Sequence, residues 1–415
     1  MDAELWPDVA CLPPRSQPRT AIARLLVQRA LARLPLRLRW PDGTVTGDAG
    51  PTLTLRDPDA FHRRIGTDGL IGFGESYMAR EWDADDLVRV LTVLCAELTT
   101  LVPPALQRLR GAWTRARPRD DRNTPTGARE NIRRHYDLSN DLFALFLDET
   151  MTYSAGIFRG FPAHQDVLAA AQRRKIDRLL DLAAVGEGSR LLEIGTGWGE
   201  LALRAAARGA RVRTVTLSAE QRDLARARVA AAGLGDRVSV ELRDYRDVDG
   251  AYDAVVSVEM IEAVGREFWP DYFATLNRLL APGGRVALQA ITMPDDRIDA
   301  TAGTHTWISK YVFPGGVIPS VEAIDRQAAA AGLSAAPSTG FGDHYAETLR
   351  LWRERFTGAA DDVAALGFDT TFRRMWHFYL AYSEAGFRAR YLDVHQFLLT
   401  RRPPAAPETK GGEAP

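Results

Sequence analysis

The sequence has few cysteines, no long apolar run and almost no net charge. Its two cysteines, Cys11 and Cys95, match no metal-binding or disulfide pattern, so a reducing cytoplasm is expected. No apolar run approaches the ~20 residues needed to span a bilayer, and the opening segment, with Asp2, Glu4 and Asp8, is unlike a signal peptide. A formal net charge of −1 argues against a general nucleic-acid binder. We therefore expect no metal and no nucleic-acid partner, and any membrane contact should be peripheral.

The 415 residues have an ordinary composition and are enough for two domains. The later part alternates helical segments with apolar strands, which are predicted at 190–194, 211–217, 238–242, 253–258 and 285–291. This alternation predicts an α/β fold, a Rossmann-like, mostly parallel sheet with helices on both faces. The predicted units are a smaller α+β N-terminal domain at 1–115, a polar linker at 116–127, a catalytic domain at 128–401 and a disordered tail at 402–415.

Finer features of the pattern lead to further expectations. Residues 1–19 look irregular, and residues 296–345 break the alternation and predict an insertion over the strand ends. Helices are expected at 20–34, 57–65, 83–98 and 368–386, and further strands at 36–40, 52–56 and 395–400. A glycine-rich segment at 69–74 lies between two of these helices.

The most informative feature is a turn after the first strand of the later part, with three glycines at alternate positions: Gly195, Gly197 and Gly199. Glycines let a ligand lie directly against the backbone. A dinucleotide-binding turn has the pattern G-x-G-x-x-G and an acidic residue about 20 positions later. Here Glu200 stands at the last glycine position, and the second strand ends in Thr-Leu-Ser. The acidic Glu193 before the turn suits S-adenosylmethionine (SAM) better, so SAM is the expected cofactor.

Other polar residues follow neighbouring strands of the predicted sheet. Ligands bind at the carboxyl ends of such strands, which places Asp244 and Tyr245 where an adenine ring can be hydrogen-bonded and stacked. Glu259 and Glu262 follow the fourth strand, where a carboxylate would face the reacting methyl group. The structural alternatives are a solvated loop at 244–245 and a surface helix position for Glu262.

Several motifs, in order along the chain, resemble the cyclopropane-fatty-acyl-phospholipid synthase family. They lie at 134–143 (RHYDLSNDLF), 151–154 (MTYS), 258–265 (VEMIEAVG), 344–349 (HYAETL) and 385–390 (AGFRAR), with GFGESYM at 72–78. The resemblance implies an enzyme that transfers a methyl group from SAM to the double bond of an unsaturated acyl chain in phospholipid. It also implies cofactor contacts from Tyr153, Ser154, Thr216, Leu217, Gln221, Asp244 and Tyr245.

The resemblance also directs attention to the group that removes a proton. Methylation of an alkene leaves a carbocation, which needs a dry, aromatic and anionic pocket. In cyclopropane-forming relatives a bound bicarbonate is the base, held by a cysteine, a glutamate, a histidine, a backbone group near an isoleucine and a tyrosine. The matching positions here are Ala155, Glu262, Gln289, Ile291 and Tyr345. A second family cysteine corresponds to Ser383.

Both cysteines and the histidine are therefore replaced, while the glutamate and the tyrosine are retained. The resemblance predicts that Glu262 and Tyr345 organise the base and the cation. Bicarbonate would then be held differently, with Gln289 as a neutral partner, or another group would take the proton. Glu149 is a candidate for that group, and its structural alternative is an exposed loop acid.

The replaced ligands bear on the product. Loss of a methyl proton with ring closure gives a cyclopropane, whereas a hydride shift before proton loss gives an exocyclic methylene. Part of the family makes such methylene-branched (10-methylene) chains, which a separate flavin-dependent reductase converts to 10-methyl chains, and this subset is favoured here. The alternatives are a cyclopropane synthase, a non-catalytic SAM- or lipid-binding partner, and a small-molecule methyltransferase.

Two arginine-rich stretches, 20–34 and 106–122, are candidates for binding anionic headgroups at the cytoplasmic membrane face. A core helix and a solvated linker are the respective alternatives. The N-terminal domain would serve lipid access or assembly into a homo-oligomer. Two groups of side chains could either pack the core or contact the acyl chain: Phe73, Tyr77 and Met78, and Phe372, Trp376, Phe378 and Tyr379.

Overall fold

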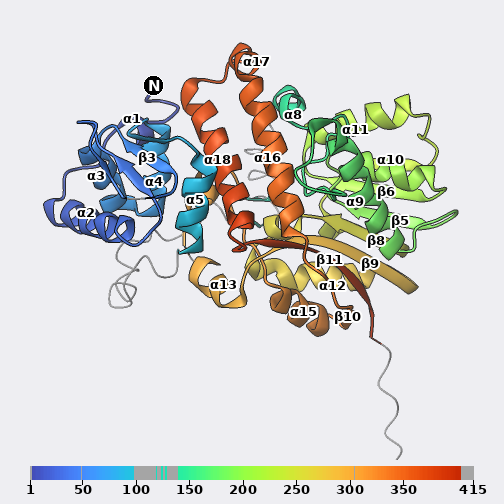
Figure 1. Ribbon diagram of the computed structural model, residues 1–415. Helices are drawn as coiled ribbons and strands as arrows, with labels where there is room; N and C mark the ends of the chain where they lie inside the picture. Colours follow the sequence, from blue (N-terminus) through green and yellow to red (C-terminus); the bar gives the residue numbers. More distant parts are fainter. Residues whose placement is uncertain are drawn as a thin grey trace, which may run out of the picture.

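A computed structural model describes residues 2–47, 49–97, 118, 123–124, 127–128, 139–302 and 304–402. A small four-stranded sheet and a larger seven-stranded sheet lie on either side of two long helices, α16 (Gly342–Gly358) and α18 (Thr370–Arg388), as Figure 1 shows. Three stretches singled out in the sequence fall wholly or largely outside the described residues: the basic stretch at 106–122, the first half of the motif at 134–143, and the C-terminal tail.

The larger sheet has the order β10-β11-β9-β8-β5-β6-β7. Its central strands are parallel, while β11 runs antiparallel to β9 and β10 antiparallel to β11. The strands are β5 (Arg190–Ile194), β6 (Arg211–Thr216), β7 (Val238–Leu242), β8 (Tyr252–Val258), β9 (Leu280–Thr292), β10 (Leu333–Ala335) and β11 (Asp393–Arg401). The predicted Rossmann-like sheet is confirmed. The expected insertion at 296–345 needs correction, because β10 within it extends the sheet.

Helices cover both faces of this sheet. Successive side chains of a strand point to opposite faces, so each face has its own apolar contacts. Leu191 packs in a cluster with Leu179 and Leu201, and Leu192 packs with Phe273 in another. The helices of this part are α8 (Asn140–Phe146), α9 (Leu168–Leu182), α10 (Glu200–Ala207), α11 (Ala219–Ala231), α12 (Trp269–Leu279), α13 (Asp295–Ala302), α14 (Trp307–Tyr311), α15 (Val321–Ala330) and α17 (Ala360–Ala365), besides α16 and α18. Short 3-10 turns occur at η3 (Gln165–Val167), η4 (Tyr245–Asp247), η5 (Ile261–Ala263) and η6 (Arg266–Phe268). The burial of both faces explains why these strands read as nearly continuous apolar runs.

The N-terminal part has its own sheet, in the order β2-β1-β3-β4. Its elements are α1 (Pro7–Ala10), α2 (Gln17–Leu31), β1 (Arg37–Arg39), β2 (Val45–Thr46), β3 (Thr52–Leu55), α3 (Pro58–Asp68), α4 (Leu70–Met78), β4 (Trp82–Ala84) and α5 (Leu87–Ala96). The irregular start expected at 1–19 is wrong, because it holds α1 and the first turn of α2. In α2, Ala23 is buried whereas Leu25 is 64% exposed, so the helix is only partly covered by neighbouring elements.

The glycine-rich segment at 69–74 lies mostly within α4, where its glycines allow close packing. A Cβ on Gly72 would lie 2.2 Å from the carbonyl oxygen of Arg64, and one on Gly74 would lie 2.4 Å from the Trp307 ring. Trp307 belongs to α14, so Gly74 brings the N-terminal part directly against the part of the chain that holds the larger sheet. Glycine normally weakens a helix; here the close approach of neighbouring elements requires it.

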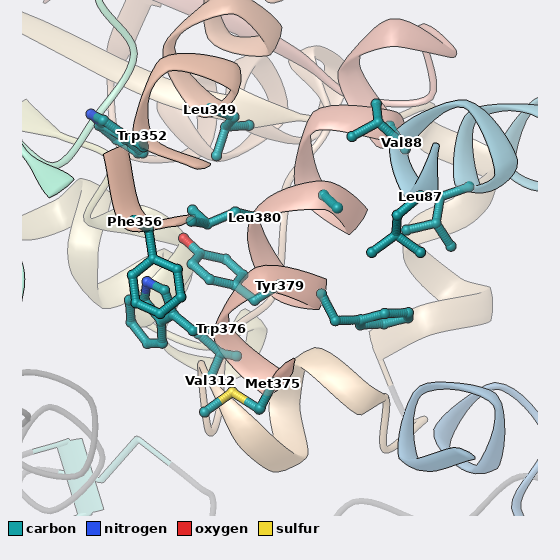
Figure 2. Close-up of a cluster of buried hydrophobic side chains, with 14 of the residues drawn as sticks. Leu87, Val88, Val312, Leu349, Trp352, Phe356, Met375, Trp376, Tyr379 and Leu380 are labelled. Carbon is teal, nitrogen blue, oxygen red and sulfur yellow. The ribbon is translucent and has the colours of Figure 1, made fainter. Parts of the chain in front are cut away.

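The N-terminal part docks on α18 through α4 and α5. The Tyr77 hydroxyl lies 3.1 Å from His377 Nδ1, and Arg374 Nε donates to the Tyr77 carbonyl oxygen at 2.7 Å. Figure 2 shows Leu87 and Val88 of α5 in the same apolar cluster as Leu380 of α18. Tyr77 and Met78 are thus core residues between the two parts. In the described ranges, no helix is both long enough and apolar enough to cross a membrane.

Candidate active site

The glycine turn forms an open, left-handed backbone between β5 and α10. Gly195, Gly197 and Gly199 have φ angles of 97°, 51° and 91°, a region that favours glycine. A Cβ on Gly197 would meet no atom within 4 Å, whereas one on Gly195 would lie 3.5 Å from Met260 Cγ. The turn therefore leaves space for a ligand directly against the backbone at the start of α10, and it lies beside the segment that follows β8.

Glu193 lies just before this turn and is 3% exposed. Burial raises the pKa of its carboxyl to about 8, against the opposing effects of Thr214 and Lys175. Within the described residues, its Oε2 atom is buried and has no hydrogen-bond partner. A buried acceptor without a partner is costly, which is consistent with a group that bonds to a ligand.

The other predicted cofactor residues surround the same strand ends. Thr216 Oγ1 donates to Gln221 Oε1 at 2.9 Å, and Leu217, between them in sequence, is half-buried. Asp244 is buried and accepts from the Arg246 guanidinium at 2.9 and 2.6 Å. The predicted adenine contacts of Asp244 and Tyr245 stay predictions, and the carboxylate has Arg246 as its partner in this structure.

Tyr153 and Ser154 lie in the segment that leads from α8 towards α9. The Tyr153 hydroxyl is 2.6 Å from the Tyr379 hydroxyl, and its ring packs 5.2 Å from that of Trp352. Ser154 Oγ accepts from Lys175 Nζ at 2.5 Å. Figure 2 shows Tyr379 and Trp352 in one cluster with Trp376, so this segment borders an aromatic wall made by α16 and α18.

Three hydrogen-bond donors converge on Glu259, which directly follows β8. Its Oε1 accepts from the Ala155 backbone N–H at 3.0 Å and from Gln289 Nε2 at 2.8 Å, and its Oε2 accepts from the Tyr345 hydroxyl at 2.6 Å. Ala155, Gln289 and Tyr345 are buried, while Glu259 is half-buried. Three distant segments therefore donate to the carboxylate of one half-buried residue.

Glu262 lies one 3-10 turn further on and has a different environment. Its Oε1 accepts from the Ile291 backbone N–H at 2.5 Å, while its buried Oε2 has no hydrogen-bond partner in the described part of the chain. Burial and, to a smaller extent, the nearby Glu259 charge raise the pKa of Glu262 to about 8. Two neighbouring carboxyls do not readily ionise together. Because Glu259 has three donors, Glu262 is the one that retains its proton near neutral pH.

Lys175 of α9 is a buried cation that the sequence analysis did not single out. Burial lowers the pKa of its amine to about 8, and the charges of Glu259, Asp148 and Glu193 oppose that shift. Its signal in the sequence is weak: Gln172 and Lys175, three positions apart, are polar residues on the otherwise apolar face of α9. Lys175 links the two carboxylates electrostatically, one at the glycine turn and one after β8.

The structure brings together Gln289, Tyr345 and Glu262 around Glu259, but it places Tyr345 on Glu259 rather than on Glu262. Sequence reasoning placed Glu259 near the reacting group without giving it a role. Glu149 lies elsewhere: its side chain is 69% exposed and pairs with Arg173 at 2.6 Å. Phe372, Trp376, Phe378 and Tyr379 are all at most 5% exposed, and they pack the core between the two parts of the chain.

Comparisons with known proteins agree on one family. The family model for mycolic acid cyclopropane synthetase matches residues 123–397. The chain is 58% identical to the tuberculostearic acid methyltransferase UfaA1 of Mycobacterium tuberculosis (strain ATCC 25618 / H37Rv), over 97% of each chain. It is 34% identical to the cyclopropane-fatty-acyl-phospholipid synthase of Escherichia coli (strain K12), over 86% of this chain and 90% of the relative.

A solved structure shares the fold of the catalytic part. The mycolic acid cyclopropane synthase CmaA1, complexed with SAH and CTAB, superposes with a TM-score of 0.60 at 30% identity. The match covers 68% of this chain and 98% of that one.

Proposed function

Since the chain belongs to the mycolic acid cyclopropane synthetase family, we propose that it is a SAM-dependent methyltransferase that methylates the double bond of an acyl chain in phospholipid and forms a methylene-branched product. The observation that carries the proposal is the 58% identity, over nearly the full length, to a tuberculostearic acid methyltransferase. The replacement of family ligands at Ala155 and Gln289 supports the same subset.

The residues present fit SAM. The open backbone at Gly197 leaves space at the glycine turn, and the Oε2 of Glu193, unpartnered among the described residues, leaves a polar atom there for a ligand. Thr216, Gln221, Asp244 and Tyr245, together with Tyr153 and Ser154, would hold the remainder. Bound there, SAM would supply a methyl group on a positively charged sulfur, which an alkene can attack.

The chain's own groups suit the cation that results. Tyr345 packs its ring against Phe387 at 4.6 Å and lies 6.3 Å from Trp352, and Glu259 is hydrogen-bonded to its hydroxyl. Aromatic faces and a carboxylate attract positive charge, especially where water is excluded. Such a pocket suits an alkene nucleophile and has little use for an oxygen or nitrogen nucleophile, which forms no carbocation.

Bicarbonate does not fit this site. The Ala155 N–H, the Gln289 amide and the Tyr345 hydroxyl all donate to Glu259, and the Ile291 N–H donates to Glu262. The groups that the family resemblance would assign to a bound anion are therefore engaged by two side-chain carboxyls. The base must come from the chain itself or from water.

The N-terminal part and the membrane belong to the same proposal. The N-terminal part would guide acyl chains towards the site from a peripheral position on the membrane. Its docking on α18, one of the two helices of the aromatic wall, supports this role. The proposal also includes assembly into a homo-oligomer and a separate flavin-dependent reductase that acts on the product.

The test is product analysis. The protein is incubated with SAM carrying a ¹³C-methyl group and phospholipid vesicles with monounsaturated chains, and the released acyl groups are analysed by NMR. Exocyclic vinyl protons on labelled carbon are the expected result. Cyclopropyl protons would establish the cyclopropane alternative, for which the 34% identical E. coli synthase is the supporting relative. Absence of label in lipid would overturn the proposed function.

A further inference from the structure

Glu259 has a left-handed backbone conformation, which is unusual for a residue other than glycine. Its φ angle is +50°, in the left-handed region where residues with a Cβ are disfavoured by about 1–2 kcal/mol. Its backbone N–H donates to the Gln289 carbonyl oxygen at 2.8 Å, which holds the residue against β9. Strain retained at a position with such specific contacts points to a functional role for the side chain.

The neighbours of Glu259 are oriented to hold an ionised carboxylate. Gln396 Nε2 donates to Gln289 Oε1 at 2.9 Å, so the amide of Gln289 presents its N–H₂ group to Glu259. Gln396 also donates to the Lys175 carbonyl oxygen at 3.2 Å, which ties this relay to α9. The pattern suits an acceptor at Glu259, because an amide N–H₂ donates and cannot accept.

The charges around Glu259 point the same way. The Lys175 ammonium and the three donors favour the ionised form, while burial raises the pKa of the carboxyl above its ordinary value. Glu262 keeps the proton of the pair. A carboxylate that is ionised yet more basic than usual is well suited to accept a proton near neutral pH.

The position of Glu259 suits the reacting centre. The next residue, Met260, has its Cγ 3.5 Å from where a Cβ on Gly195 would lie, so Glu259 follows the strand end beside the cofactor turn. Its Oε2 accepts from Tyr345, and a carboxylate oxygen can accept a second bond. The residue as a whole is half-buried and so is not fully enclosed in the core.

We propose that Glu259 is the resident catalytic base of this enzyme, a side-chain carboxylate that takes the proton for which cyclopropane-forming relatives use a bound anion. This inference rests on the proposed function. Glu262, retained as a neutral neighbour, and Gln289, Gln396 and Lys175 are positioning residues that act through Glu259.

The electron and proton balance of the reaction is complete with this assignment. The alkene π pair forms the new carbon–carbon bond to the methyl group, and the pair of the methyl–sulfur bond stays on sulfur. A hydride moves from the methylated carbon to the neighbouring cationic carbon. One methyl C–H bond then breaks, its electron pair forms the exocyclic double bond, and the proton goes to Glu259 Oε2. The acid returns the proton to water after the product leaves.

Two substitutions and two binding measurements test the proposal. Glu259→Gln keeps the size of the side chain but cannot accept the proton, and Glu259→Gly relieves the left-handed strain and leaves the three donors without their carboxylate. The matched control is Glu187→Gln, whose side chain is 80% exposed. Turnover on phospholipid vesicles is measured with and without added bicarbonate, and SAH affinity by calorimetry reports a correctly folded cofactor site.

We expect wild-type turnover to be independent of bicarbonate and Glu259→Gln to lose at least about 100-fold, the usual contribution of a general base. Glu259→Gly should lose a similar factor and regain part of it with bicarbonate. A readout other than activity is ¹³C-bicarbonate NMR: line broadening is expected with Glu259→Gly and not with the wild type. Bicarbonate binding by the wild type, or Glu259→Gln turnover within threefold of wild type, would overturn the assignment. An inactive wild type would instead refute the proposed function.

Discussion

The Tyr345 hydroxyl donates to Glu259 Oε2 at 2.6 Å across 86 residues of sequence, joining α16 to the end of β8. Glu262, the retained family glutamate, has the Ile291 N–H as its partner instead. Two carboxyls three residues apart are thereby placed in different environments: one has three donors, and the other has a single donor and an oxygen with no partner among the described residues. Pairs of this kind commonly divide acid and base roles between them.

Tyr345→Phe removes one donor from Glu259 and leaves the ring in place. A hydrogen bond to a charged group contributes about 1.5–3 kcal/mol, so kcat/KM should fall roughly 10- to 100-fold. Loss of a donor to the ionised form also raises the pKa of Glu259, so the acidic limb of the pH–rate profile should move to higher pH. An unchanged profile with unchanged SAH affinity would show that the tyrosine does not act on this carboxylate.

Gly197→Ala tests the cofactor turn. The φ angle of 51° makes any Cβ unfavourable by about 1–2 kcal/mol, and that Cβ would project into the space proposed for SAM. We expect SAH affinity, measured by calorimetry, to fall at least about tenfold. Gly233→Ala is the matched control, since Gly233 has a φ angle of 66° and equally open surroundings but follows α11. Equal SAH affinity in both variants would argue against cofactor binding at Gly197.

Glu193→Gln tests the buried carboxyl before the turn. Its folded-state pKa is raised to about 8 by burial, whereas an unfolded glutamate titrates near ~4.3. Between these values the native state retains a proton that the unfolded state has released, so this group lowers stability as pH rises from about 4.5 to 8. The free energy of unfolding of the variant, relative to that of the wild type, should therefore increase by up to about 1.4 kcal/mol per pH unit over that range. Urea unfolding at pH 5, 6.5 and 8 measures the difference; a pH-independent difference would contradict the assignment.

Arg374→Ala tests the docking of the N-terminal part on α18. The guanidinium donates to the Tyr77 carbonyl oxygen at 2.7 Å and lies 3.9 Å from the centre of the Tyr77 ring, with its side chain 17% exposed. Loss of these contacts, and of longer ones to the Trp82 carbonyl oxygen and Asp83, should lower the free energy of unfolding by about 2 kcal/mol and expose the N-terminal part to limited proteolysis. Arg222→Ala, which loses only a pairing with the neighbouring Asp223, serves as the control. Equal protease resistance would mean that Arg374 does not hold this interface.

Much of the catalytic fold was predictable because its signals are local. Parallel strands buried on both faces read as apolar runs, so the predicted strands at 190–194 and 238–242 coincide with β5 and β7. The glycine turn could also be predicted from the sequence, because a left-handed backbone favours glycine and the three glycines lie within five residues. The N-terminal part was less predictable: glycines such as those of α4 are typical of helix breaks, and only the close approach of Trp307, distant in sequence, explains Gly74.

The sequence by itself determined the family, the cofactor turn and the absence of the expected cysteine and histidine at Ala155 and Gln289. Only the tertiary structure decided what stands in their place. The donors of Ala155, Gln289 and Tyr345 come from three separate segments, and no local pattern reveals that they converge. A left-handed turn at Glu259, rather than its residue type, aims its carboxylate at them and leaves Glu262 to the Ile291 N–H. The choice of base is thus a matter of side-chain direction, which long-range packing sets.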